Sequence, residues 1–337
     1  MAATMKTIAR DLGVSVVTVS KVLHNHSDIG RETRKRVLQR IKEVNYQPNL
    51  SARALSTGRT SLVGLIVPDL VHPFFAQVAK GISAELSEQG YSLIISSSEE
   101  NPQLEKREID QMIARRVDAL ILASTQTDLK DFQNLGERGL SLVLLDRKVS
   151  GFDANFVGID DERAGVLATA HLVDVGCKTI AHIAGSNVST ALDRERGYLQ
   201  TLKKHGLSLP AVYISKHGAG DDSGDSTGYR AMNQLLRLQP RPDGVFCCND
   251  PIAMGAMRAI LEAGLRIPED IAMVGCGNVH YDDLLRVPLS SVDQDSAGLG
   301  ASAAKLALSI TKNKSDARHK SVLLPARLVI RASSTRK

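Results

Sequence analysis

The catalytic motif that stands out in the sequence is a serine flanked by glycines. Residues 224–228 (GDSTG) match the G-x-S-x-G pattern of α/β-hydrolases, and His319 lies downstream where a base would be needed. That chemistry requires the serine on a sharp turn directly after a strand, whereas a polar, glycine-rich run over 217–225 intervenes here. Ser226 is better explained as a helix cap, so we expect no enzyme and keep a hydrolase as the catalytic alternative.

The sequence contains no pattern that supports a metal-binding or nucleotide-binding site. His24 and His26 form a two-histidine turn without further ligands. The cysteines lack metal-ligand spacing and are Cys177, Cys247, Cys248 and Cys276. No G-x-G-x-x-G or Walker A pattern occurs. We therefore expect no catalytic residue, no metal and no cofactor.

A different chemistry is suggested by residues 16–23 (VVTVSKVL). On a helical wheel the apolar side gathers Val19, Val22 and Leu23. Val17 and Lys21 point nearly opposite, flanked by Val16 and Ser20. An exposed valine gains nothing from water, but apolar side chains contact thymine methyl groups in a DNA major groove, and lysine contacts guanine or phosphate. The pattern favours DNA binding over a three-helix cap with a stray surface valine.

The elements that would position this face are three short helices. Helical patterns cover 5–12, 16–23 and roughly 31–45, with Thr4 and Ser15 as caps. Residues 1–60 carry eleven Lys and Arg against four Asp and Glu, a net charge of +7, while the remaining 277 residues have a net charge of −2. A basic helix-turn-helix head on a neutral body indicates a polyanion-binding module, and a merely solvated basic surface is the alternative.

From Ser61 onward, short β-rich runs alternate with amphipathic helical patterns, as in parallel α/β sheets. The predicted strands are 61–68, 91–98, 117–124, 140–146, 156–160, 179–185, 211–216, 244–249, 271–277, 289–294 and 321–330. The predicted helices are 74–90, 103–116, 128–138, 162–175, 190–206, 226–237, 250–264 and 296–313. Eleven strands exceed one small sheet, so we expect two doubly wound parallel lobes with a ligand-binding cleft between them.

Several motifs extend along the whole chain. The head contains A-x3-GVS-x2-TVSKVL over 9–23, followed by Y-x-PN over 46–49 and AR-x-L over 52–55. Later motifs in order are Pro73-Phe74-Phe75, Leu145-Asp146-Arg147, Arg194-x2-Gly197-Tyr198, Asn249-Asp250-x4-Gly255 and Val274-Gly275. Together they resemble the LacI/GalR (lactose-repressor) family of bacterial transcription regulators.

The resemblance implies a domain order. It gives a helix-turn-helix DNA-binding domain over 1–47, a hinge helix and linker over 48–60, and a periplasmic-binding-protein-like effector-binding and dimerisation domain over 61–337. The lobes would comprise about 61–160 with 294–322 (N-lobe), and about 161–293 with 323–337 (C-lobe).

For DNA, the resemblance implies base reading by Val16, Val17 and Lys21 and a phosphate contact by Ser20. Residues 49–56 (NLSARALS) are too few for a stable isolated helix. The resemblance implies that they fold on the operator, with Leu55 wedged into the minor groove; a short linker helix is the alternative. The full expected DNA-contact set is Thr4, Ser15, Val16, Val17, Thr18, Ser20, Lys21, Asn49, Ala52, Arg53 and Leu55.

For the effector, the resemblance implies a polar ring suited to hydroxyl groups. Its expected members are Asp69, Phe74, Asp146, Arg147, Thr190, Arg194, Asn249 and Gly277. At Gly277 the family pattern commonly has an aspartate. Its loss beside Arg147 and Arg194 predicts a positive site and an acidic sugar derivative. The alternatives are that Asn278 or a water molecule supplies the missing acceptor, or that the loop turns differently.

The sequence thus predicts a transcriptional regulator, usually a repressor in this family, that binds a pseudo-palindromic operator as a dimer under the control of a small sugar-like effector. A periplasmic sugar-binding receptor is the other alternative. The +7 head and the lack of a signal-peptide pattern argue against it, and no apolar run reaches membrane-spanning length. We expect a cytoplasmic homodimer, because the chain stops at RASSTRK without the leucine-rich helical tail of tetrameric members.

Overall fold

The computed structural model describes residues 4–23, 25–46, 58–126, 140–216, 224–312 and 318–336. The chain divides into two compact units, Met1–Thr60 and Ser61–Lys337. The predicted hinge over 49–56 and the predicted helix over 128–138 lie outside the described residues.

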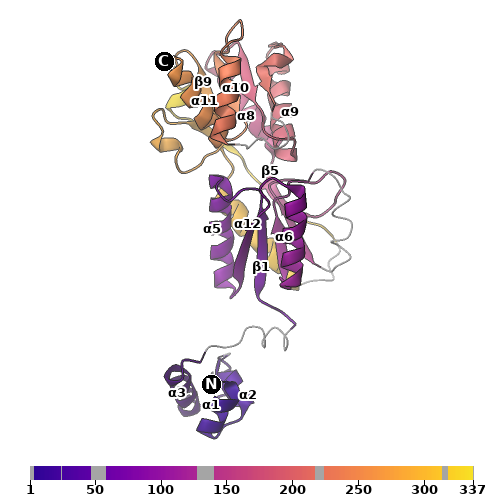
Figure 1. Ribbon diagram of the computed structural model, residues 1–337, viewed down its shortest axis with the longest axis vertical. Helices are drawn as coiled ribbons and strands as arrows, with labels where there is room; N and C mark the ends of the chain where they lie inside the picture. Colours follow the sequence, from indigo (N-terminus) through magenta and orange to yellow (C-terminus); the bar gives the residue numbers. More distant parts are fainter. Residues whose placement is uncertain are drawn as a thin grey trace. The chain divides into compact units, whose positions relative to one another are not determined.

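The first unit contains the three predicted helices: α1 (Met5–Leu12), α2 (Val16–Leu23) and α3 (Arg31–Glu43) (Figure 1). Thr4 caps α1 because its hydroxyl oxygen accepts a hydrogen bond from the Thr7 amide at 3.1 Å. Gly13 ends α1 in the left-handed conformation, with φ 65°. The helices enclose a small core of Ile8, Ala9, Val19, Val22 and Val37.

The N-lobe of the second unit is built on a six-stranded parallel sheet in the order β11-β5-β4-β3-β1-β2. Its strands are β1 (Leu62–Val67), β2 (Ser92–Ser97), β3 (Ala119–Leu122), β4 (Ser141–Leu145), β5 (Asn155–Ile159) and β11 (Ser321–Leu324). Alternate residues of β1 face opposite sides: Val63 packs with α5 (Pro73–Glu88) and α12 (Ser296–Lys312), and Ile66 packs with α6 (Pro102–Ala114). Figure 1 shows these three helices around β1.

The C-lobe has a second six-stranded sheet in the order β12-β10-β9-β8-β6-β7. Its strands are β6 (Ile180–Ile183), β7 (Ile214–Ser215), β8 (Gly244–Cys247), β9 (Ala272–Gly277), β10 (Ser290–Asp293) and β12 (Arg327–Val329). Its helices are α8 (Asp161–Asp174), α9 (Ser189–Lys204), α10 (Asp225–Leu235) and α11 (Asp250–Glu262). The pair α8 and α9 covers one face, and the pair α10 and α11 covers the other (Figure 1).

Two predicted strands differ from the structure. The single strand predicted over 321–330 is two strands, because Pro325 and Ala326 break the ladder and β12 joins the other lobe's sheet. β12 also runs antiparallel to β10, so the C-lobe sheet is not wholly parallel. The strand predicted over 211–216 is mostly a 3-10 turn, with only Ile214–Ser215 paired to β6.

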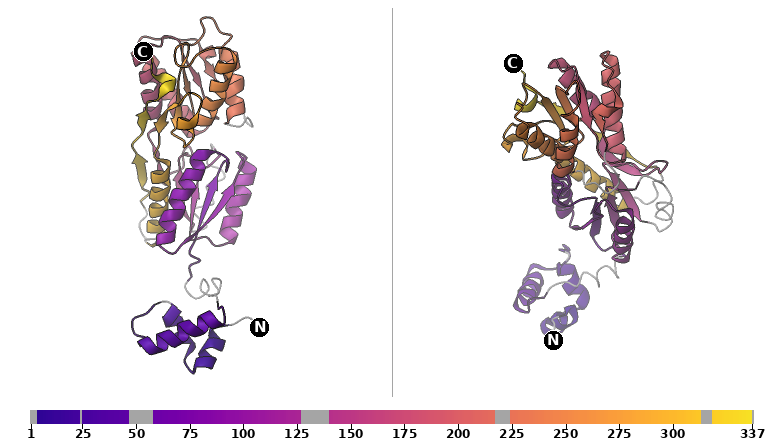
Figure 2. Two further views of the ribbon diagram at one scale, coloured as in Figure 1. Left: turned by 90° about the vertical axis from the view of Figure 1, so that its left-hand side faces the viewer. Right: turned by 45° about the horizontal axis from the view of Figure 1, so that its top comes forward.

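The chain passes between the lobes at three places in its described part, after β5, after β10 and after β11 (Figure 2). These crossings bring side chains from distant parts of the sequence to the facing ends of the two sheets. Among the described helices, none is both long and apolar enough to traverse a bilayer.

Candidate functional site

The outer face of α2 presents two valines to solvent. Val17 is 63% exposed and Val16 is 38% exposed, whereas Val19 and Val22 are buried. The expected outward orientation of Val17 is therefore confirmed. Apolar side chains at this angle on the second helix of a helix-turn-helix unit suit contact with base edges.

Several of the polar side chains expected to contact DNA already have partners within the head. The hydroxyl oxygen of Ser15 caps α2 by accepting from the Thr18 amide at 3.0 Å, and the two hydroxyl groups lie 2.9 Å apart. Lys21 forms an ion pair with Asp28, which lowers the pKa of that carboxyl group. Ser20 is half-buried on the same helix. The remaining expected DNA contacts, Asn49, Ala52, Arg53 and Leu55, lie outside the described residues.

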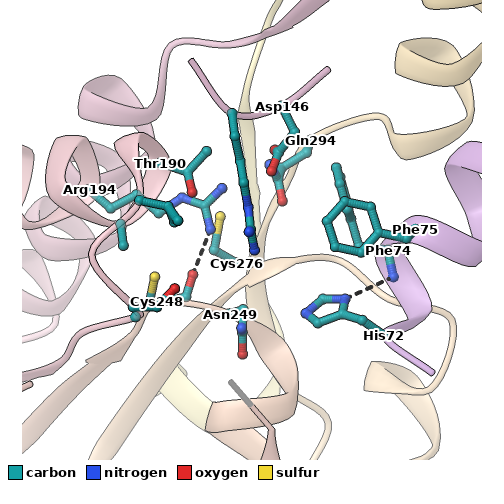
Figure 3. A pocket seen from close by; sticks show the side chains of 15 residues that line it. His72, Phe74, Phe75, Asp146, Thr190, Arg194, Cys248, Asn249, Cys276 and Gln294 are labelled. Atoms are coloured by element: carbon teal, nitrogen blue, oxygen red, sulfur yellow. Dashed lines mark hydrogen bonds between the residues drawn. The ribbon is translucent and has the colours of Figure 1, made fainter. Parts of the chain in front are cut away.

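A cavity between the two lobes of the second unit collects most of the expected effector residues (Figure 3). The N-lobe contributes the start of α5 and the loop after β4. The C-lobe contributes the start of α9 and the ends of β8 and β9. The lining residues that the argument uses are His72, Phe74, Asp146, Arg147, Arg194 and Gln294.

Aromatic rings form the N-lobe wall of this cavity. His72 caps α5 by accepting from the Phe74 amide at 3.3 Å, and its ring lies edge-on to Phe75 with the centroids 5.5 Å apart. Burial, reinforced by the positive charges of Arg147 and Arg194, lowers the pKa of His72 to about 4. His72 is therefore neutral near pH 7 and offers a polar ring rather than a charge.

Arg194 reaches into the C-lobe side of the cavity with every guanidinium nitrogen occupied. Its Nε donates to Oδ1 of Asp161 at 2.8 Å, and its Nη2 lies 2.7 Å from the same oxygen. Its Nη1 donates to the Cys248 carbonyl at 2.7 Å (Figure 3). Burial raises the pKa of Asp161, and the charge of Arg194 opposes that shift.

Close helix packing holds this arginine in place. A Cβ at Gly165 of α8 would lie 2.2 Å from the Arg194 carbonyl oxygen, and one at Gly197 of α9 would lie 2.1 Å from the Glu162 carbonyl oxygen. Only glycine allows α8 and α9 to approach this closely. The approach brings Asp161, in the first turn of α8, against Arg194.

The other arginine of the cavity, Arg147, forms an ion pair with Glu100. Its Nη2 donates to Oε1 of Glu100 at 2.8 Å and its Nη1 donates to Oε2 at 3.0 Å, a two-point contact. Next to it, Asp146 is buried in the left-handed conformation with φ 63°, and burial raises the pKa of its carboxyl group. The guanidinium carbon of Arg147 lies 5.9 Å from the Phe75 ring centroid, within cation–π range.

These contacts correct the charge predicted for the site. The expectation of a positive cavity treated Arg147 and Arg194 as unpaired, but Glu100 and Asp161 accompany them. Asp146 adds a third carboxyl group. With the arginines charged and their partners ionised, the group is neutral when Asp146 is protonated and negative when it is not, so the premise for an acidic effector is wrong.

The structure brings together six of the eight expected effector residues: Phe74, Asp146, Arg147, Thr190, Arg194 and Asn249. The other two do not line the cavity. Asp69 is half-buried, and its Oδ1 accepts from the Val71 amide at 2.7 Å in a local turn. Gly277 has φ 140°, and a Cβ there would lie 2.8 Å from Oδ2 of Asp250; its neighbour Cys276 lines the cavity instead.

Some residues of the cavity and its surroundings were not predicted from the sequence. They are the lining residues His72, Cys248, Cys276 and Gln294, and the two arginine partners Glu100 and Asp161. The sequence held a signal for two of them, because Cys248 and Gln294 lie at or next to the ends of the predicted strands over 244–249 and 289–294. No sequence pattern links Glu100 to Arg147, because the two residues are 47 positions apart.

The hydrolase alternative is not supported by the described geometry. Ser226 is exposed in the first turn of α10, whose N-cap residue is Gly224 and not the serine. His319 lies 3.2 Å from Asp153, beside the N-lobe strands, whereas α10 belongs to the C-lobe. The described residues also contain no group of three or more His, Cys, Asp or Glu suited to a metal ion.

Comparison with known proteins agrees with both units. Residues 4–49 match the model of "Bacterial regulatory proteins, lacI family", and residues 60–332 match "Periplasmic binding proteins and sugar binding domain of LacI family". The chain is 34% identical over 335 residues to the HTH-type transcriptional repressor PurR of Pasteurella multocida, and 32% identical to that of Mannheimia succiniciproducens, covering 98% of each chain in both cases.

Solved structures give the same result. The lac repressor dimer bound to operator and the anti-inducer ONPF superimposes with a TM-score of 0.87, at 27% identity and 99% coverage of both chains. The transcriptional regulator CelR in complex with cellobiose gives 0.74 at 28% identity, covering 98% of this chain and 99% of that one.

Proposed function

Because this chain belongs to the LacI family of bacterial regulatory proteins, a family of DNA-binding transcriptional regulators and not of enzymes, we propose that it represses transcription from a pseudo-palindromic operator. Proteins of this family act as dimers on DNA and respond to small molecules. A two-fold dimer presents two recognition helices to successive major grooves, which is why the operator should be pseudo-palindromic.

The observation that carries this proposal is the outer face of α2. Val17 is the most exposed valine of that helix, and Lys21 lies one turn along the same side. We assign base reading to Val16, Val17 and Lys21, and backbone contacts to Thr4, Ser15, Thr18 and Ser20. The hinge residues Asn49, Ala52, Arg53 and Leu55 are proposed to contact the minor groove when two chains meet on DNA.

Selection of operator fragments from a random DNA pool tests this assignment. The full chain should retain palindromic fragments whose binding weakens steeply as salt rises. A chain beginning at Ser61 should retain none. Equal retention by the shortened chain would contradict the assignment of DNA binding to the head.

We further propose that a small polar effector, such as a sugar or sugar derivative, occupies the cavity between the lobes. The wall combines hydrogen-bonding groups with the aromatic rings of Phe74 and Phe75, a mixture suited to the hydroxyl groups and C–H faces of a sugar. CelR, which has a related fold, is solved with cellobiose. Phe74, Asp146, Thr190 and Asn249 are the side chains proposed to contact the ligand directly.

A thermal-shift screen of sugars, sugar acids and nucleobases identifies the class of effector. A ligand that binds only the folded chain raises its apparent stability, by about 2.7 kcal/mol at a hundred times the dissociation constant. Replacing Asn249 with Ala should abolish the shift produced by the best compound. A shift that persists in the variant would place the ligand elsewhere.

A further inference from the structure

We propose that Glu100 excludes acidic effectors, because it occupies the binding fork of Arg147 and so leaves the cavity to polar ligands without a negative charge. This inference rests on the proposed effector site and names the chemical class that the site selects. It reverses the acidic effector expected from the sequence.

The first support is the geometry of the ion pair. Both terminal nitrogens of Arg147 bind the two carboxylate oxygens of Glu100, at 2.8 and 3.0 Å. This is the two-point geometry that an arginine uses for a carboxylate or phosphate group of a ligand. The Arg147 side chain is 9% exposed and that of Glu100 is 28% exposed. Glu100 therefore occupies the fork that the acidic group of a ligand would need, although of the two residues only Arg147 lines the cavity.

The second support is the backbone that carries Glu100. Glu99 and Glu100 both adopt the left-handed conformation, with φ 49° and φ 51°, which side-chain-bearing residues rarely do. The turn is held by the Glu100 amide, which donates to the Pro68 carbonyl at 3.0 Å, and by the Asn101 amide, which donates to the Ser98 carbonyl at 2.8 Å. This turn holds an unfavourable backbone conformation, and it places the Glu100 carboxylate against Arg147. Strained backbone that is fixed in this way is typical of functional positions.

The third support is what remains for a ligand to bind. The Nε of Arg147 is buried and has no hydrogen-bond partner in the described part of the chain. It is a single donor, which a hydroxyl oxygen can satisfy without the two-point contact that an anion would make. Asp146, which also lines the cavity, offers acceptors for hydroxyl hydrogens. A ligand anion would instead join three carboxyl groups that share two arginines, and the repulsion would be strong in this buried setting.

Calorimetric titration with inorganic phosphate tests the proposal without knowledge of the natural effector. Glu100→Gln keeps the shape of the side chain and removes its charge. We expect this variant to bind phosphate at least about tenfold more tightly than the wild-type chain, because the fork of Arg147 becomes available to an anion. Titrations with glucose and glucuronate, which differ by one carboxylate, should shift towards the acid in the same variant.

Glu99→Gln is the matched control, since it removes the same charge from the neighbouring left-handed residue. The Oε1 of Glu99 accepts from the Ser97 hydroxyl group and not from Arg147. Equal gains in the two variants, or wild-type phosphate binding as tight as that of Glu100→Gln, would overturn the proposal. If Glu100→Gln does not fold, Glu100→Asn replaces it, because asparagine removes the same charge and tolerates the left-handed conformation at φ 51°. A gain is again expected, and no gain counts against the proposal.

These titrations use neither operator DNA nor the natural effector. Operator selection and the thermal-shift screen with Asn249→Ala report separately on the proposed DNA binding and on the proposed effector site. A failure of DNA binding and a failure of the charge filter are therefore distinguishable.

Discussion

The charged residues of the DNA-binding head and those of the effector cavity lie in opposite environments. In the head, Lys21 and its partner Asp28 are 40% and 53% exposed. In the cavity, Arg194 and Asp161 are each 6% exposed. An exposed lysine can exchange a carboxylate for a phosphate at little cost, because water screens both contacts. A buried arginine cannot, because its partner would be left charged and without water.

This difference indicates that DNA and the effector are recognised by different kinds of interaction. DNA binding by the head should depend strongly on salt, since it releases counterions from phosphates. Effector binding in the cavity should depend on hydrogen bonds and shape, with the arginines acting as fixed parts of the wall. Substitutions that remove one partner of an ion pair should therefore affect the two regions very differently.

The largest effect is expected from Asp161→Ala. This substitution leaves the Arg194 guanidinium buried without its carboxylate, and breaking such a pair typically destabilises a protein by about 3–5 kcal/mol. Urea unfolding followed by circular dichroism should show this loss in the free energy of unfolding.

The matched control is the next residue of the same helix turn. Glu162 pairs with Arg196 at 2.6 Å, but the two side chains are 35% and 53% exposed. Glu162→Ala should cause little or no loss, because exposed ion pairs contribute little. Similar losses in the two variants would remove the distinction between exposed and buried pairs.

A smaller loss is expected from Gly277→Ala, which tests how tightly the cavity end of β9 is packed. The backbone at Gly277 has φ 140°, and a new Cβ would lie 2.8 Å from Oδ2 of Asp250. That carboxylate cannot move easily, because it accepts from the Val279 amide and the Ser291 hydroxyl group. We expect a loss of about 1–3 kcal/mol in the free energy of unfolding.

Gly264→Ala separates conformational strain from crowding. Gly264 also has a positive φ, 74°, but nothing lies within 4 Å of its added Cβ. Gly277→Ala should therefore be the more destabilising of the two in the same urea experiment. If Gly264→Ala is equally destabilising, crowding against Asp250 contributes nothing.

The head could be predicted from sequence because its function follows helical periodicity. Val19 and Val22 had to face the core of a three-helix unit, which left Val17 outside, and the structure confirms that division. The boundaries of α1 were also predictable, since the Thr4 hydroxyl group caps its first turn and Gly13 adopts the left-handed conformation that ends it.

The cavity was only partly predictable because its charges are set by distant partners. Strand ends and family motifs located Arg147 and Arg194, but nothing local to either residue indicates Glu100 or Asp161. Gly277 was misplaced for a similar reason. The family pattern placed this position in the cavity, whereas the space beside Gly277 holds Asp250, which precedes it by 27 residues.

A pH-dependent effect of up to about 1.4 kcal/mol per pH unit is expected from Asp282→Asn. Asp282 is fully buried, and burial together with the nearby Asp250 raises its pKa from 3.8 to about 9. The folded chain thus keeps a proton that the unfolded chain releases between these pH values. The stabilisation is complete below pH 3.8 and is lost as pH rises towards 9.

Asparagine supplies a permanent N–H in place of that proton. The free energy of unfolding of Asp282→Asn should therefore fall less steeply than that of the wild type between pH 6 and pH 9, by up to about 1.4 kcal/mol per pH unit. Asp283→Asn is the neighbouring exposed control, and parallel curves for Asp282→Asn and the wild type would show that Asp282 does not hold the proton.

The smallest effect on stability, and the sharpest test of the head, is expected from Asp28→Asn. Lys21 is paired with Asp28 in the free protein, so the pair must open or be shared when Lys21 approaches a base or phosphate. Removing the carboxylate should leave the melting temperature nearly unchanged, because both side chains are exposed. DNA affinity should rise, by less than about tenfold, because a free lysine has no internal competitor and one negative charge is removed near the phosphates. Fluorescence anisotropy with an operator fragment and with unrelated DNA measures both affinities.

Asp11→Asn is the matched control. It removes a carboxylate of the same unit that pairs with Arg40 of α3, so it should raise operator affinity less than Asp28→Asn does. Equal increases would mean that Asp28 acts only through net charge, whereas a larger increase at the operator places Lys21 in contact with its bases.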